Sequence, residues 1–363
     1  MREIWKKLPW IVGGIVAIIA LINPAWLPWA LLAVAVIVCM FLPKRGLIGP
    51  VELPADDAFL PQEQVQWWYW TGHLHTEDGR RFGFEIVFFA FDSFVIMRDQ
   101  LVQAAITDVA GQTFSFEEFL EFHLPDRTKN GFNLSSGIGN KVTAVGGGGH
   151  DRLHAEIGDY VLDLQLDTDL PAAMHYGGDA HPYRFGGYTY YYSRPRMATK
   201  GSLSIKGQTF SVTGNSWFDR QYGELYQAIN QGWQWFALEL DDNRQIMLFD
   251  FQGNDASVEK SGSITDAEGR TVTLAAHEFE VTVLGEWTSP NTGCTYPSGW
   301  ALEVRGEKFT VQPLLKDQEL HAKHTLWIGP VYWEGACSVD GAQTGSAYVE
   351  LNGFCRCAAK LGV

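Results

Sequence analysis

The chain has 363 residues, of which 46% are hydrophobic and 19% are charged. This is enough apolar material for a large core, and the length exceeds that of a usual single domain. The formal net charge is −15, and residues 1–45 contribute +4 because five basic side chains outweigh one acidic side chain. The rest of the chain therefore carries −15 − 4 = −19. A body this acidic is repelled by phosphates, which excludes nucleic acid as a partner.

The first 45 residues predict a membrane anchor. No charged residue lies between Leu8 and Pro43, and this run is long enough to enter a bilayer. Asn23-Pro24 divides the run, and because helices normally stop before such a pair, we expect a transmembrane hairpin of two apolar helices. Both ends carry basic residues, namely Arg2, Lys6, Lys7, Lys44 and Arg45. The positive-inside rule then places the globular part on the cytoplasmic side of the inner membrane.

Cysteine usage agrees with a cytoplasmic domain. Cys39 lies in the apolar run, and the remaining cysteines are Cys294, Cys337, Cys355 and Cys357. Their spacing matches neither a metal-binding motif nor a dense disulfide framework. We therefore expect reduced thiols, and a disulfide would argue against the cytoplasmic orientation.

Beyond Val51 the sequence predicts antiparallel strands. Apolar side chains alternate with other residues between Arg81 and Phe91, which is the period of a strand. Two hairpins are indicated by turn residues, one at Lys206-Gly207 and one at Asp241-Asp242-Asn243.

One helix is expected, from about Phe116 to Leu124. Ser115 and Glu118 match a capping box, and Phe116, Phe119, Leu120 and Leu124 fall on one helical stripe. The rest of the chain after the membrane segment is predicted to be β structure.

Two segments of the predicted strands are similar to each other. WYWTGHLHTEDGRRFGFEIVFF begins at Trp68 and WQWFALELDDNRQIMLFDF begins at Trp233. Each contains Trp-x-Trp, an alternating strand, an acidic turn and a second apolar strand. Such a repeat indicates a duplicated β domain. We therefore predict an N-terminal domain at residues 46–226 and a C-terminal domain at residues 227–363, after the membrane segment 1–45.

The aromatic residues of these segments have two interpretations. Small barrels of about eight strands leave room for one apolar ligand. Trp68, Trp70, Trp233 and Trp235 are then candidates for binding it. The alternative is that these side chains fill the cores, as aromatic strand residues usually do.

Six stretches of the sequence, in this order, resemble a known family: VQWWYWTGHL, FGFEIVFF, YYYSRPRM, NSWFDRQYG, GWQWFALEL and VYWEGACSVDGAQTGSAYVELNGF. They resemble the tandem lipocalin-like family that includes the AttH proteins and carotenoid 1,2-hydratase (hydroxyneurosporene synthase). The resemblance runs from about Val51 to the C-terminus. It implies an all-β fold of two lipocalin-like antiparallel β-barrels in tandem and an isoprenoid, polyene or other lipid as ligand. It also implies reactions such as the hydration of a terminal isoprenoid double bond.

Asp219 is the candidate acid for such a reaction. Protonating an unactivated alkene requires a carboxylic acid that keeps its proton near neutral pH, and burial among apolar groups achieves this. Aromatic faces stabilise the resulting carbocation, and Trp217 lies beside Asp219. Tyr190 and Tyr192 project to one strand face and are candidates for lining the cavity or orienting water.

A structural role for Asp219 is the alternative. Three arginines lie nearby in the sequence or in the adjacent motif, namely Arg194, Arg196 and Arg220. An ion pair with one of them would keep Asp219 ionised and tie the two barrels together.

Three glutamates lie among the predicted strands. Glu85 points to solvent if Phe82, Phe84, Ile86 and Phe88 face inward, and the opposite register would bury it as a ligand-binding residue. Glu334 and Glu350 lie in strands that are expected to pair across the turn at Asp340-Gly341. Both are interpreted as structural hydrogen-bonding residues.

No metal or cofactor site is predicted. His73 and His75 share a strand face at a spacing that metal ligands use, but no third ligand is near in the sequence. No motif of a serine or cysteine hydrolase occurs either.

Two functions remain open at this point. In the first, a membrane-anchored enzyme uses Asp219 for acid-initiated hydration, isomerisation or cyclisation of a hydrophobic small molecule taken from the membrane. In the second, the protein is a non-catalytic lipid carrier or a chaperone that works with a membrane transport system.

Overall fold

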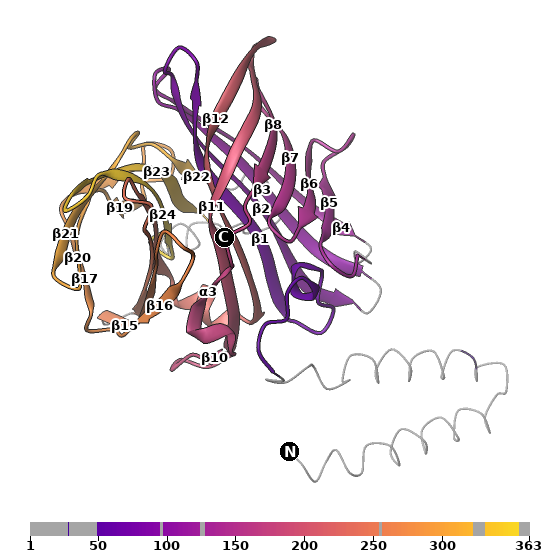
Figure 1. Ribbon diagram of the computed structural model, residues 1–363. Helices are drawn as coiled ribbons and strands as arrows, with labels where there is room; N and C mark the ends of the chain where they lie inside the picture. Colours follow the sequence, from indigo (N-terminus) through magenta and orange to yellow (C-terminus); the bar gives the residue numbers. More distant parts are fainter. Residues whose placement is uncertain are drawn as a thin grey trace.

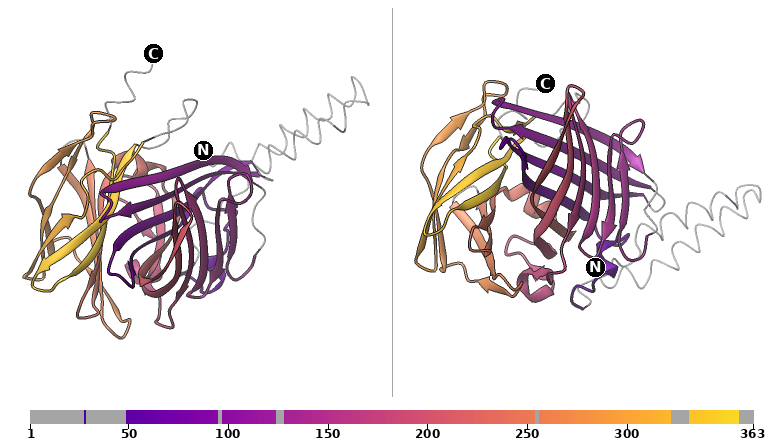
Figure 2. Two further views of the ribbon diagram at one scale, coloured as in Figure 1. Left: turned by 90° about the horizontal axis from the view of Figure 1, so that it is seen from above. Right: turned by 45° about the horizontal axis from the view of Figure 1, so that its top comes forward.

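The computed structural model describes residues 28, 49–94, 97–123, 128–253, 256–321 and 331–355. Two antiparallel sheets each curve into a nearly closed barrel, and the barrels lie side by side (Figures 1 and 2). Apart from residue 28, the predicted membrane hairpin falls outside the described residues. Within the described ranges, no helix is both long and apolar enough to cross a membrane.

The first barrel contains the strands up to Glu224, in the order β4-β3-β2-β1-β12-β11-β8-β7-β6-β5, with β9 and β10 also paired to β11. The strands are β1 Val65–Thr76, β2 Arg81–Phe94, β3 Met97–Asp108, β4 Thr113–His123, β5 Phe132–Ser136, β6 Val142–Gly147, β7 His150–Ile157, β8 Tyr160–Asp167, β9 Ala173–Met174, β10 His181–Pro182, β11 Tyr188–Ile205 and β12 Gln208–Glu224. Two short 3-10 helices belong to this part, η2 Ala55–Asp57 and η3 His175–Gly178.

The helix α3 (Tyr226–Gln231) leads into the second barrel. Its order is β16-β15-β14-β13-β24-β23-β21-β20-β17, with β22 on β23 and a separate β18-β19 pair. The strands are β13 Trp233–Leu240, β14 Gln245–Gly253, β15 Ala256–Thr265, β16 Thr271–Leu274, β17 Phe279–Val283, β18 Glu286–Thr288, β19 Thr295–Pro297, β20 Trp300–Val304, β21 Glu307–Pro313, β22 Glu319–Leu320, β23 Tyr332–Gly341 and β24 Gly345–Asn352.

The two sheets share a connection pattern, in agreement with two β domains of one kind. In each barrel the first strand, β1 or β13, pairs with the strand that follows it and with the last strand of the sheet, β12 or β24. The predicted hairpins at Lys206-Gly207 and at Asp241-Asp242-Asn243 are also present. Lys206 and Gly207 both have positive φ, as a two-residue hairpin turn of type I′ requires.

The predicted helix at Phe116 to Leu124 is wrong. Residues 113–123 form β4 and pair with β3 along their whole length. Alternate side chains take opposite faces, because Phe116 packs with Leu320 and Tyr332 while Phe119 packs against the first-barrel core. The capping pattern is a local signal, and pairing with a long neighbouring strand outweighs it in a segment rich in phenylalanine.

Among the described residues, three large apolar cores and the small cluster around Phe116 hold the molecule together. One fills the first barrel, one fills the second, and a third lies between them. The third core is built from the outer faces of strands of both barrels, including Tyr69, Trp217, Trp235, Phe249 and Tyr348. Each barrel therefore covers part of the outer face of the other, and these outer faces are buried inside the molecule.

Close packing at this junction requires a glycine. A Cβ added to Gly83 of β2 would lie 2.5 Å from the Cβ of Ala336 of β23, which is too close for two carbon atoms. Gly83 therefore lets a strand of the first barrel approach a strand of the second.

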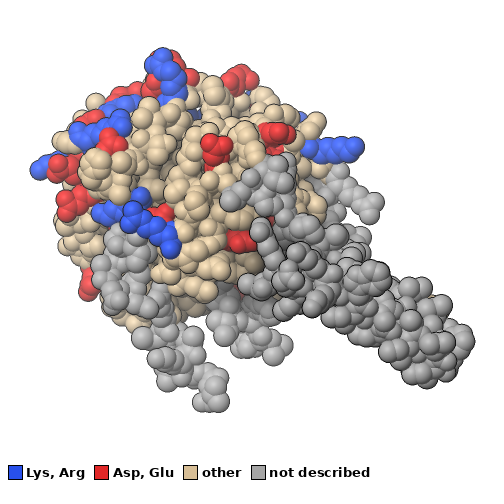
Figure 3. Space-filling view, turned by 90° about the horizontal axis from the view of Figure 1, so that it is seen from below, with Lys and Arg blue, Asp and Glu red and all other residues tan. Residues whose placement is uncertain are grey.

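The surface carries mixed charge. On the face shown in Figure 3, acidic and basic side chains are interspersed mainly around the rim. Several form ion pairs, such as Arg244 with Glu307 at 2.7 Å and Arg305 with Glu278 at 2.8 Å.

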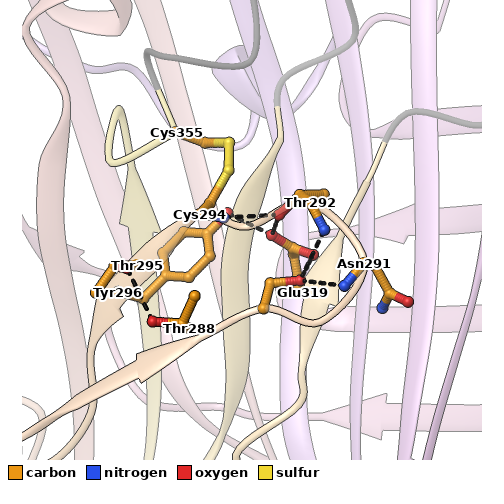
Figure 4. Close-up of a disulfide and its surroundings, with 9 residues drawn as sticks. Thr288, Asn291, Thr292, Cys294, Thr295, Tyr296, Glu319 and Cys355 are labelled. Atoms are coloured by element: carbon orange, nitrogen blue, oxygen red, sulfur yellow. Dashed lines mark hydrogen bonds between the residues drawn. A yellow bond between two sulfur atoms is a disulfide. The ribbon is translucent and has the colours of Figure 1, made fainter.

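A disulfide joins Cys294 to Cys355, which corrects the expectation of reduced thiols for these two residues (Figure 4). Their Cα atoms are 5.1 Å apart across a sequence separation of 61 residues, so no short-range spacing rule could reveal the pair. Cys337 is buried and free. Tyr296, two residues from Cys294, donates a hydrogen bond to the buried Glu319 at 2.8 Å.

This pairing predicts the thiol chemistry of the full-length protein. After denaturation without reductant, a maleimide should modify Cys337 but leave Cys294 and Cys355 unmodified, because their sulfur atoms are already bonded. Reduction before labelling should make both reactive. Peptide mass spectrometry reads each site, with Cys337 as the internal control. Labelling of Cys294 before reduction would contradict the disulfide.

Candidate functional site

A narrow pocket lies between the barrels at the third core. Its walls are the aromatic side chains of Trp67, Tyr69, Phe89, Trp233, Trp235 and Phe249. Three carboxyl groups also line it, those of Asp219, Glu334 and Glu350. The free volume in which the centre of a water molecule can move is about 20 Å³. A site holds one water molecule once this volume reaches about 10–15 Å³, so the pocket as it stands has room for about one water.

Strand pairing places Asp219 at this pocket. Asp219 lies in the middle of β12, opposite Ser193 of β11 and Tyr69 of β1. Because strand side chains alternate, its neighbour Phe218 points into the first barrel while Asp219 points toward the second. The Asp219 residue is 4% exposed.

Three side chains donate hydrogen bonds to Asp219. Tyr191 Oη donates to Oδ2 at 2.7 Å, and Trp217 Nε1 donates to Oδ1 at 2.6 Å. Ser193 Oγ also donates to Oδ1. The predicted partner Trp217 is therefore in direct contact with Asp219.

The ion-pair interpretation of Asp219 is wrong. Arg194 forms a two-pronged ion pair with Asp57 instead, at 2.9 Å for each bond. Arg220 donates to backbone carbonyls and stacks over an indole ring inside the first barrel, and Arg196 donates to two carbonyls of the second. Alternation along β12 carries Arg220 to the face opposite Asp219.

The environment favours a protonated Asp219. Burial raises the pKa of the carboxyl group from its usual range to about 7, although the bonds from Ser193, Tyr191 and Trp217 oppose this rise. Oδ1 accepts two bonds and Oδ2 accepts one. Oδ2 accepts fewer hydrogen bonds, so it is the oxygen with the greater capacity to carry the proton of the acid form.

Glu85, Glu334 and Glu350 form a second acidic group at the junction, referred to below as the glutamate cluster. Glu334 and Glu350 lie opposite each other on β23 and β24, the two strands that the sequence predicted to pair. Glu334 accepts a hydrogen bond from Tyr69. Burial raises the pKa of Glu85 and of Glu350 to about 8, and burial together with the other two carboxyls raises that of Glu334 well above its usual range.

Glu85 corrects a prediction. Phe82, Phe84, Ile86 and Phe88 do face the interior of the first barrel, and Glu85 does take the other face. That face meets the second barrel rather than solvent, so Glu85 is fully buried. Within the described residues, neither of its carboxyl oxygens has a hydrogen-bond partner.

The other predicted aromatic residues divide between two places. Trp233 and Trp235 reach the junction, and Trp235 Nε1 donates to Tyr191 Oη at 3.2 Å. Trp68 and Trp70 are instead fully buried inside the first barrel. Their indole N–H groups bond the Asp57 carbonyl at 2.8 Å and the Asp151 carboxyl at 2.9 Å. For Trp68 and Trp70 the core-filling interpretation holds.

Tyr190 and Tyr192 also face the first-barrel interior and do not reach Asp219. Tyr192 Oη donates to Asp57 at 2.5 Å, and its register partner on β12 is Arg220. The prediction that Tyr190 and Tyr192 line the cavity beside Asp219 is off by one position, because the intervening Tyr191 bonds Asp219.

Several residues at or near the pocket were not predicted from the sequence. Trp67 and Tyr69 alternate with the predicted Trp68 and Trp70 and line the pocket from the other strand face. His175 is also among them: it is 2% exposed and bonds Ser193, which donates to Asp219. Period-two alternation could have identified Tyr69 and Tyr191, whereas no spacing signal marks His175.

The two histidines of β1 differ in solvent exposure. His73 is buried and bonds the carbonyl of Ala347 in the second barrel at 2.9 Å, while His75 is exposed. Across the described ranges, no group of three or more His, Cys, Asp and Glu side chains is arranged to hold a metal ion.

The raised pKa values predict how stability depends on pH. A carboxyl group whose folded pKa exceeds its unfolded value stabilises the fold below the unfolded pKa, and this contribution is lost as pH rises through the folded pKa. For Glu85 the window runs from about pH 4 in the unfolded chain to about pH 8 in the folded chain. The free energy of unfolding of the full-length protein should therefore fall across this window.

Glu85→Gln should flatten this dependence by roughly 1 kcal/mol per pH unit. Denaturant unfolding at about pH 5, 6, 7 and 8 measures the slope. Glu280→Gln, at an exposed position of β17, is the matched control and should keep the wild-type slope. Equal slopes in wild type and Glu85→Gln would show that Glu85 is ionised at neutral pH.

Comparison with known proteins agrees with this architecture. The AttH-like family model matches residues 45–354. Among solved structures, an AttH protein of Nitrosomonas europaea is 25% identical with a TM-score of 0.76, covering 86% of this chain and 100% of that one. Kievitone hydratase of Nectria haematococca is 19% identical with a TM-score of 0.64, covering 85% of this chain and 94% of that one.

No match is found among curated protein sequences. The family model nevertheless spans most of the chain, and the resemblance to AttH proteins noted from six short stretches is thereby confirmed. The chain belongs to the AttH-like family.

Proposed function

We propose that this protein binds a hydrophobic unsaturated molecule, such as an isoprenoid, polyene or lipid, and that Asp219 catalyses an acid-initiated reaction on it. The observation that carries the proposal is a buried carboxyl group that faces an aromatic pocket, with a pKa of about 7 and arginine neighbours turned away. Such a group keeps a proton near neutral pH and can deliver it to carbon.

One acidic group is sufficient for each of these reactions. The proton on Asp219 Oδ2 goes to an alkene carbon, the π electrons form the new C–H bond, and a carbocation and a carboxylate remain. For hydration, a water oxygen bonds the cationic carbon and returns a proton to Asp219. For isomerisation, an adjacent C–H proton returns to Asp219; for cyclisation, a second double bond attacks before that return. In each case the acid is regenerated.

The pocket walls suit a cationic intermediate. Trp235 lies edge-on to Tyr69, with ring centroids 5.5 Å apart, and to Trp217 at 6.1 Å. Aromatic faces attract positive charge, most strongly where water is excluded. Kievitone hydratase is a hydratase by its name, so hydration is one of the reactions that this proposal includes.

The size of the pocket limits how the ligand binds. Free volume for about one water admits the nucleophile of a hydration but no branched hydrocarbon end. The ligand end therefore enters when wall side chains such as Trp233, 7% exposed, change rotamer. The long remainder of the molecule stays outside this pocket.

Residues 1–45 are proposed to anchor the protein to the inner membrane, where a hydrophobic ligand is concentrated. Flanking positive charge favours barrels on the cytoplasmic side, whereas the Cys294–Cys355 disulfide favours an oxidising compartment. We give the disulfide more weight and propose that the barrels face the oxidising side. An impermeant maleimide applied to intact cells after an impermeant reductant should then label Cys294; labelling only after lysis would place the barrels in the cytoplasm.

Lipid analysis tests the reaction. Lipids extracted from membranes of a host that makes isoprenoids, and from the purified full-length protein, are compared by mass spectrometry for wild type, Asp219→Asn and Asp169→Asn. Asp169 has a fully exposed side chain and serves as the control. We expect a species that gains the mass of water, or changes retention at constant mass, with wild type and Asp169→Asn but not with Asp219→Asn.

The other outcome has an equally clear meaning. If all three proteins carry the same bound lipid and leave the membrane lipids unchanged, the enzyme proposal fails for the lipids of that host. The protein would then be a carrier or chaperone for a hydrophobic molecule, and Asp219 a structural hydrogen-bond acceptor.

A further inference from the structure

A chain of hydrogen bonds runs from the second barrel to Asp219. The Oγ atom of Ser263, on β15, lies 3.0 Å from His175 Nδ1. His175 Nε2 lies 2.7 Å from Ser193 Oγ on β11. Ser193 in turn donates to Asp219 Oδ1. His175 and Ser263 are each 2% exposed and Ser193 is fully buried, so the chain is closed to solvent.

The hydrogen bond from Ser193 to Asp219 determines which atom donates and which accepts in the other bonds of this chain. Because the Ser193 hydroxyl donates to Asp219, its oxygen is left to accept, and His175 Nε2 must carry the hydrogen. The other ring nitrogen, Nδ1, then lacks a hydrogen and accepts from the Ser263 hydroxyl. This is a neutral imidazole in a single tautomer, and burial lowers the pKa of His175 to about 3, which keeps it neutral.

His175 also contacts the second donor of Asp219. Its ring centroid lies 4.1 Å from that of Tyr191, with the planes 36° apart. Tyr191 Oη donates to Asp219 Oδ2. One histidine thus touches the side chains that bond both carboxyl oxygens.

We propose that Ser263, His175 and Ser193 act as a positioning relay, which holds a hydroxyl donor on Asp219 Oδ1 and so leaves Oδ2 to carry the acidic proton. The inference deepens the proposed function and rests on it for its catalytic meaning. His175 does not touch the ligand, so it is a positioning residue. Since Ser263 belongs to the second barrel and Asp219 to the first, the relay is complete only when the barrels are docked.

The other groups around Asp219 define what a titration will report. Tyr191 and Ser193 face it from β11, Trp217 from its own strand, and Glu350 from the second barrel. Each hydrogen bond donated to the carboxylate form lowers the pKa of Asp219, and polarisation along the chain strengthens the Ser193 bond. Removing a relay member should therefore raise the pKa of Asp219. The rise should be smaller for a member that lies farther from Asp219.

The relay is tested on the full-length protein without any lipid. Aspartate side-chain carboxyl carbons are labelled with ¹³C and titrated by NMR, and Asp219→Asn identifies the Asp219 signal. Ser193→Ala should raise the pKa of Asp219 by about 1 unit, His175→Phe by about half a unit to one unit, and Ser263→Ala by less. Phenylalanine keeps the ring contact with Tyr191. His175→Gln, which restores an N–H donor toward Ser193, should return the pKa toward the wild-type value.

A second buried histidine supplies the matched control. His73 also bonds across the junction, to the carbonyl of Ala347, but has no place in the chain of bonds to Asp219. His73→Phe should disturb packing as much as His175→Phe does and leave the pKa of Asp219 unchanged.

Two results would overturn the relay. One is an unchanged pKa of Asp219 in both His175→Phe and Ser263→Ala; the mild Ser263→Ala change keeps the test valid if His175→Phe fails to fold. The other is an equal shift in His73→Phe, which would indicate general loosening. Because no lipid is involved, a failed relay is distinguishable from a failed enzyme proposal, which the lipid analysis decides separately.

Discussion

The structure depends on packing the outer face of one barrel against the outer face of the other. A barrel ordinarily turns one side of each strand to its core and the other to water. Here the outer side of β1, β2 and β12 meets the second barrel, so both sides of these strands are buried. Gly83 allows the closest approach. Polar side chains on this face lose water, and their chemistry follows from that loss.

Burial without a cation is the consequence that matters most. Asp219 and the glutamate cluster lie in a region whose neighbours are aromatic rings and hydroxyl groups. The arginine that comes next in sequence, Arg220, is carried by strand alternation into the first barrel, where it bonds carbonyls. The same sheet therefore separates two electrostatic settings, with the Asp57–Arg194 ion pair inside the first barrel and carboxyl groups of raised pKa between the barrels.

The sequence predicted the strands, the hairpins and the duplication, because these depend on periods and turns within short segments. It placed Glu85 on the correct face of β2 but could not show that a second barrel covers that face. It placed Tyr192 rather than Tyr191 beside Asp219, since the side facing the junction depends on register across three strands.

The remaining differences also come from contacts between distant segments. The helix expected near Phe116 is a strand because β3 is available to pair with it. The Cys294–Cys355 bond and the chain from Ser263 to Asp219 join residues 61 and 44 positions apart, the latter from 263 − 219. No local pattern marks such pairs. The burial of Asp219 could be predicted, because its aromatic neighbours in the sequence indicate an apolar environment for the carboxyl group.

The central claim is that a carboxylic acid, and not a carboxylate, occupies the junction near neutral pH. Infrared difference spectroscopy of the full-length protein measures this directly, because the C=O stretch of a protonated carboxyl group is distinct from the carboxylate bands. We predict a carboxylic acid band at about pH 6 that is weaker in Asp219→Asn, and the part of the band that this substitution removes should also be lost from wild type as the pH rises to about 9. If the carboxylic acid band at about pH 6 were the same in wild type and Asp219→Asn, and only the carboxylate bands differed, Asp219 would be ionised and the central claim would be contradicted.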